Sequence, residues 1–187
     1  MSEIILFLHE DGAENGVPQA MTDFEIAYTV RLPDLYKKIV GTFDEASIYP
    51  NLFFPKMPPE VFDNIQSGAN FSDFFSFETA LAFWNGKDYG AGKPPGMFFL
   101  GSTGGGVEVL MSLRPKDHGA IYCWYHSTNI WGTDGNDDGA LYEQAESLAA
   151  FLSSLTDTAS KAHRAFIDEE DLEGAVTIDL PAPEWRL

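Results

Sequence analysis

The segment Pro94–His126, PPGMFFLGSTGGGVEVLMSLRPKDHGAIYCWYH, alternates apolar runs with turns that are rich in glycine and proline. Its first run is wholly apolar, and the next two alternate in polarity, which is typical of strands. These runs occupy residues 97–100, 107–112 and 121–126. The connections, GSTGGG at 101–106 and RPKDHG at 114–119, favour tight turns. The stretch predicts an antiparallel meander of strands that the rest of the chain covers.

Helices are predicted on both sides of this meander. Leu32-Pro33-Asp34 opens the first, because proline suits a first turn and a carboxylate suits the positive end of the helix dipole; Gly41 would end it. Ser76 would cap a second helix that ends at Asn85-Gly86, although a strand also fits there. A stripe at helical spacing predicts a third helix over residues 141–155, formed by Leu141, Ala145, Leu148, Leu152 and Leu155.

Other segments are less regular. Residues 4–8 fit either an edge strand or the start of a helix. Residues 42–75 are rich in Phe and Pro, which forbids a long regular element and favours an extended wrap around the core with a short helix over 59–66. The alternative for this segment is a partner-binding surface. Beyond the meander we expect a helix over 157–168 and an edge strand over 175–180.

Charge is the strongest compositional signal. The 187 residues hold 29 Asp and Glu against 11 Lys and Arg, a formal net charge of −18. Such a chain repels nucleic acid and anionic lipid and attracts basic partners, although solubility alone also explains an acidic surface. No apolar run approaches the ~20 residues of a membrane span, no basic leader precedes the first apolar run, and Cys123 is the single cysteine. We therefore expect a cytoplasmic protein.

No motif in the chain supplies a catalytic set. GSTGGG lacks the Lys and Ser or Thr of a phosphate-binding loop, and the glycines precede a strand. DGNDDG at 134–139 fits the first half of a calcium loop but lacks its closing Glu, so an acidic loop is the preferred interpretation. The histidines are scattered, and Cys123 fits a core position. We predict no catalytic residues, no metal site, no cofactor and no enzyme activity.

Within this frame, Met97 to Met111 resembles the central motif of the SUKH superfamily, also called the SMI/KNR family. Leu32-Pro33-Asp34-Leu35-Tyr36-Lys37 resembles its early LP-x-x-Y/F helix, and Ser147 to Leu152 (SLAAFL) resembles the helix after its sheet. The resemblance spans about residues 24–155. The acidic helix usual before the LP element is poorly formed here, and the proline-rich insert and the tail are additions.

The resemblance implies an α+β fold, a central antiparallel or mixed sheet with a glycine-rich turn, covered by helices. We expect one domain over 1–187, with the core at 24–155 and a helical, acidic extension at 156–187. Bacterial members of the superfamily look like immunity proteins that neutralise toxins, often nucleases; fungal relatives act in regulation and signalling.

The sequence therefore favours a non-enzymatic binding protein that occludes the active site of a basic toxin domain, with no nucleic-acid or membrane partner. The alternative is a regulatory or scaffold module of the SMI/KNR type. The oligomeric state is left open. The expected partner surface combines acidic and aromatic side chains. Each Asp could instead be explained by solvation or helix capping, and each Trp by packing in the core. Its candidate residues are Asp134, Asp137, Asp138, Trp124 and Trp131.

Overall fold

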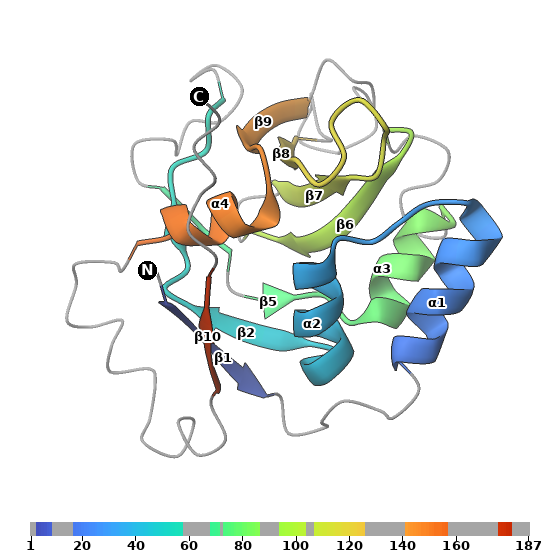
Figure 1. Ribbon diagram of the computed structural model, residues 1–187. Coiled ribbons are helices and arrows are strands. Elements are labelled where there is room, and N and C mark those ends of the chain that lie inside the picture. Colours follow the sequence, from blue (N-terminus) through green and yellow to red (C-terminus); the bar gives the residue numbers. More distant parts are fainter. Residues whose placement is uncertain are drawn as a thin grey trace, which may run out of the picture.

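The computed structural model describes residues 3–8, 17–57, 68–71, 73–86, 94–103, 107–125, 141–156 and 176–180. The predicted α+β class is confirmed, and so is the meander at its centre (Figure 1). Neighbouring strands of this sheet are antiparallel, in the order β6-β7-β8-β9. Their bounds are Met97–Ser102, Glu108–Ser112, Ile121–Trp124 and Leu141–Ala145. The first three strands are buried on both faces except at Ser102, which explains why the run at 97–100 is wholly apolar.

A second antiparallel sheet has the order β10-β1-β2-β5. Its strands span Val176–Asp179, Glu3–Leu8, Ala46–Tyr49 and Asp73–Phe74. The strand alternative for residues 4–8 is therefore confirmed, but this strand is interior because it pairs on both sides. The expected edge strand over 175–180 is confirmed as β10, so the end of the chain contributes to the same sheet as its beginning.

The two sheets meet where β5 approaches β6. The amide of Phe75 donates to the carbonyl oxygen of Leu100 at 2.8 Å, and Phe71 forms an isolated bridge with Thr103. Gly101 belongs to β6 rather than to the turn after it, which corrects the expected turn bounds. A Cβ at Gly101 would overlap the carbonyl oxygen of Asp73 and lie 2.6 Å from Cε2 of Phe71. Glycine is required here by close approach of two backbones.

Among the described residues, four helices cover this framework. They span Val17–Tyr28 (α1), Asp34–Phe43 (α2), Phe77–Trp84 (α3) and Leu148–Ser154 (α4). The Oγ atoms of Ser76 and Ser147 each accept a backbone N–H three residues on, which fixes the first turns of α3 and α4. Figure 1 shows α1 and α3 next to each other beside β6, where Tyr28 meets Trp84 at 5.6 Å between ring centroids.

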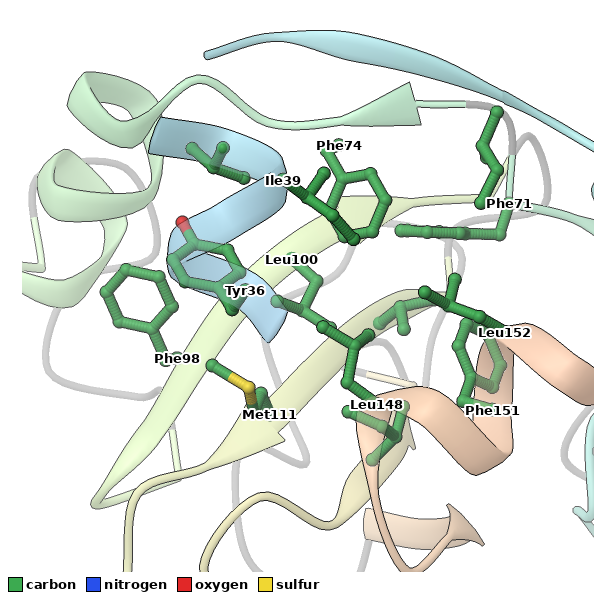
Figure 2. Close-up of a cluster of buried hydrophobic side chains, with 14 of the residues drawn as sticks. Tyr36, Ile39, Phe71, Phe74, Phe98, Leu100, Met111, Leu148, Phe151 and Leu152 are labelled. Atoms are coloured by element: carbon green, nitrogen blue, oxygen red, sulfur yellow. The ribbon is translucent and has the colours of Figure 1, made fainter. Parts of the chain in front are cut away.

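The main core lies between the sheets and helices α2 and α4, as Figure 2 shows. Tyr36 of α2 meets Phe98 of β6 edge-on at 5.5 Å, and Phe151 of α4 meets Phe71 at 5.6 Å. Edge-to-face contacts between aromatic rings add about 1 kcal/mol each beyond their burial. A smaller cluster occupies the other face of the meander, formed by Met97, Phe99, Leu110, Ala120, Tyr122 and Trp124.

The expected helix over 141–155 is wrong in its first half. Residues 141–145 form β9, which pairs with β8, and the helix begins only after Ser147. These residues pair with the side of β8 that lies away from β7, and the Ser147 cap sets where α4 starts. Gly41 also fails to end its helix, because α2 continues to Phe43 and ends where Asp44 adopts φ 52°. The helix over 76–86 is confirmed, with Gly86 at φ 74° after its last turn.

The extended wrap is confirmed for the described part of residues 42–75. Short strands β3 (Leu52–Phe53) and β4 (Ala69–Asn70) pair with each other, and Leu52 also exchanges backbone hydrogen bonds with Thr156. Phe53, Phe71 and Phe74 are buried, whereas Phe54 is 58% exposed. The helices expected over 59–66 and 157–168 lie outside the described residues.

Candidate interaction surfaces

One end of the meander carries the connection from β6 to β7 and the connection from β8 to β9. The strand register aligns Ser102 with Glu108, Glu108 with Trp124, and Trp124 with Leu141. The glycine-rich turn and the segment 126–140 therefore both start and finish at this row of residues. Asp134, Asp137, Asp138 and Trp131 belong to that segment and lie outside the described residues, as does the half calcium loop.

Trp124 does not belong to an exposed surface. Its side chain is fully buried, and its ring meets Phe99 edge-on at 5.9 Å. Trp124 pairs with Glu108 of β7, whose side chain is only 5% exposed. The core-packing alternative therefore describes Trp124, because a buried ring offers no area to a partner, and the expectation that it contacts one is corrected.

A groove of about 450 Å³ opens elsewhere on the molecule. Three segments that are distant in sequence form its walls: residues 31–35 before and into α2, the β7–β8 turn at His118 and Gly119, and residues 147–149 at the start of α4. The Nε2–H of His118 donates to the carbonyl oxygen of Arg31 at 2.6 Å, which fastens the first wall to the second. Gly119, at φ 86°, takes a conformation that favours glycine beside Pro33.

Ion pairs position the first wall of the groove, residues 31–35. One carboxylate oxygen of Glu25 accepts from the amide of Leu32 at 2.7 Å and lies 3.4 Å from Nζ of Lys37. Asp34 lies 3.2 Å from the same ammonium and 3.7 Å from the guanidinium of Arg31. The hydrogen bond from Lys37 and the two positive charges lower the pKa of the exposed Asp34 carboxyl. The Asp34 side chain is 79% exposed, so these pairs position the wall more than they stabilise the fold.

The second wall is braced from within by a more buried network. Asp117 binds the guanidinium of Arg114 with both oxygens, at 3.2 and 2.6 Å, and accepts from the hydroxyls of Ser112 and Tyr122 at 2.6 and 2.8 Å. Burial alone would raise the pKa of Asp117, but these hydrogen bonds and the positive charge outweigh it and set the pKa at about 2. Burial, the bond to Asp117 and its negative charge raise the pKa of Tyr122 to about 12.

The described residues give no indication of a metal or nucleophile centre. No group of three or more His, Cys, Asp or Glu could hold a metal ion in that part of the chain. Cys123 is a fully buried core residue, as the sequence indicates, and burial raises the pKa of its thiol. Over the same residues, no helix is long and apolar enough to span a membrane.

Sequence reasoning missed the groove, although it singled out two of its walls. The LP element and the Ser147 segment were recognised as separate helix starts, and the structure brings them together. Glu25 and His118 carried no signal, because each acts on a backbone atom seven or more residues away.

The fold and these surfaces define an α+β protein with an open groove between α2, the β7–β8 turn and α4. The SMI1/KNR4 family (SUKH-1) matches residues 18–154, and the chain belongs to this family. The suspected SUKH resemblance is thereby confirmed, and all three groove walls lie inside the matched region. Members of the family are generally non-catalytic, and family membership suggests a role in protein–protein interaction. Neither the curated proteins nor the solved structures gave a match to this chain.

Proposed function

We propose that this chain is a non-enzymatic immunity protein, which binds a basic toxin domain of the nuclease type and covers its active site. Family membership supports a binding role. The observation that selects the partner is the net charge of −18. Nucleases present positive surfaces to phosphates, and an acidic protein both accelerates encounter with such a surface and competes with the substrate there.

The proposed contact surface lies at the end of the meander where segment 126–140 begins and finishes. Asp134, Asp137 and Asp138 bring three negative charges to a segment whose sequence contains no Lys or Arg, and Trp131 supplies an aromatic side chain three residues before Asp134 in the sequence. An aromatic anchor within a charged rim is typical of tight interfaces. Trp124 no longer belongs to this set, because it packs in the core.

The experiment mixes the purified chain with the toxin domain encoded by the adjacent gene and measures binding and residual toxin activity at several salt concentrations. We expect inhibition that weakens as salt screens the charges. A chain that binds the neighbour without inhibiting it would indicate the regulatory or scaffold alternative. Neither binding nor inhibition would refute the immunity function.

A matched pair of variants tests the surface separately. The first replaces Asp134, Asp137 and Asp138 by Asn; the control replaces Asp23, Glu45 and Glu78, which are exposed on other elements, by Asn or Gln. Both variants change the net charge equally. We expect the first to weaken binding at least about tenfold more than the control, since charges inside an interface act on dissociation as well as on encounter. Equal losses of affinity in the two variants would be explained by long-range charge steering alone, and would show that Asp134, Asp137 and Asp138 do not form the contact surface.

A further inference from the structure

The groove between α2, the β7–β8 turn and α4 has an apolar lining. Its leucines are Leu32, Leu35 and Leu148, of which the first and last belong to the main core and Leu35 is half-buried. Figure 1 shows α2 and α4 side by side in front of the meander. The groove is therefore bounded by elements that the core holds in place, and it exposes apolar surface between them.

Basic residues concentrate around the first two walls of this groove. Residues 31–38 and 114–119 hold 5 of the 11 Lys and Arg of the chain but only 2 of its 29 Asp and Glu, which leaves 6 against 27 elsewhere. The groove is therefore flanked by an excess of positive charge on a protein that is otherwise strongly acidic. Its surroundings favour a different partner from the one that the whole chain attracts.

Two of these cations have no counter-charge in the described part of the chain. The carboxylates of Asp34 and Asp117 are already paired with neighbouring cations. Lys38 and Lys116 are exposed, and among the described residues neither side chain takes part in a hydrogen bond or an ion pair. Lys38 follows Leu35 by three residues on α2 and so lies on the same face of the helix. Lys116 belongs to the turn that forms the second wall.

The groove lies at the end of the meander opposite to that at which segment 126–140 begins and finishes. Met111 pairs with Ile121 next to the β7–β8 turn, whereas Glu108 pairs with Trp124 at the other end of the same two strands. A molecule in the groove would therefore contact the sheet at a different end from a molecule bound at that segment.

We propose that the groove is a second binding site, which takes a short acidic segment of a partner protein. Its volume of about 450 Å³ accommodates a few side chains. An apolar side chain of the segment packs against Leu35 and Leu148, while carboxylates beside it meet Lys38 and Lys116. Clusters of cations recognise acidic motifs in other proteins in this way. Glu146, exposed next to the third wall, directs the carboxylates toward the first two walls.

A peptide array tests the class of ligand without presupposing one sequence. It carries random acidic octamers that contain Leu, Ile or Phe, each beside a counterpart in which Gln and Asn replace Glu and Asp. The labelled full chain is applied at physiological salt. We expect the acidic octamers to bind more strongly, although the net charge of −18 would by itself favour the neutral counterparts. Neutral octamers that bind equally or better, or binding of neither kind, would overturn the proposal.

Matched variants then test the two lysines. Lys38→Ala combined with Lys116→Ala removes two positive charges beside the groove. Gln19→Glu combined with Thr22→Glu changes the net charge equally at exposed positions near the start of α1. We expect the affinity for the strongest acidic octamer to fall about tenfold in the lysine variant and less than about twofold in the control, because only the first loses ion pairs with the peptide. Equal losses would show that the octamer binds elsewhere.

Amide chemical shifts locate the octamer independently. On its addition to the full chain, we expect the largest shifts at the three walls, residues 31–35, 118–119 and 147–149. Shifts confined to other residues would overturn the assignment to the groove. These experiments use no toxin domain, so their failure leaves the immunity function untouched, and failure of the toxin experiment leaves the groove untouched.

Discussion

Replacing Gly101 by Ala tests how closely the two sheets approach. The added Cβ would overlap the carbonyl oxygen of Asp73 and lie 2.6 Å from a ring carbon of Phe71, which is itself fully buried. A backbone oxygen in a paired strand cannot move aside as the end of a flexible side chain can. Overpacking of this kind costs about 1–3 kcal/mol, and a clash with backbone belongs at the upper end, so we expect a loss of about 3 kcal/mol.

Gly41→Ala is the matched control, because it adds the same methyl group in a different environment. Gly41 lies inside α2, and its added Cβ would meet only Sδ of Met21 at 3.9 Å, an ordinary contact. Alanine is favoured over glycine inside a helix, so this variant should gain up to about 1 kcal/mol. Urea unfolding followed by tryptophan fluorescence measures both values. Equal midpoints for wild type and Gly101→Ala would refute the close approach of β5 and β6.

Two further predictions concern the partly buried carboxylate of Asp117 and the buried hydroxyl of Tyr36. Asp117→Asn should lower the free energy of unfolding by about 1–2 kcal/mol at pH 7. Because the pKa of Asp117 is depressed to about 2 in the folded chain, the stability it gives is present above about pH 4 and is lost as the pH falls toward 2. Unfolding curves from pH 7 to pH 2 should converge for the two proteins, and a constant difference would contradict this. Tyr36→Phe should raise the free energy of unfolding by about 1 kcal/mol, since the buried phenolic oxygen has no hydrogen-bond partner among the described residues. An unfolding temperature below that of the wild type would contradict this.

The meander could be predicted because each of its segments carries a complete local signal. Three apolar runs are separated by turns, and neighbouring runs pair in sequence order, so little depends on distant residues. The helix starts at Asp34 and Ser76 were equally local. The sheet that joins β1, β2 and β10 carried no such signal, because the pairing of Glu3 with Asp179 links the two ends of the chain.

The error over residues 141–155 shows how a periodic pattern misleads when an element is short. Leu148 and Leu152 do lie on the buried face of α4, and Leu155 is buried directly after it, but Leu141 and Ala145 fall in phase with them by coincidence. The resemblance to the SUKH helix began at Ser147 and was correct where the periodicity was not. Ser147 was the useful local signal, since a serine before an apolar run favours a helix N-terminus.

Charge links the fold to the proposed function. Most basic side chains in the described part of the chain already have a partner: Arg31, Lys37 and Arg114 lie against carboxylates, and Lys56 binds a carbonyl group. These cations stabilise particular walls and edges, and each is fixed beside its own partner. The whole chain has 29 Asp and Glu against 11 Lys and Arg, so most of its carboxylates have no internal cation to pair with. A basic partner would neutralise that excess at the interface, which predicts that complex formation releases the self-repulsion of the free chain and raises its unfolding temperature most at low salt.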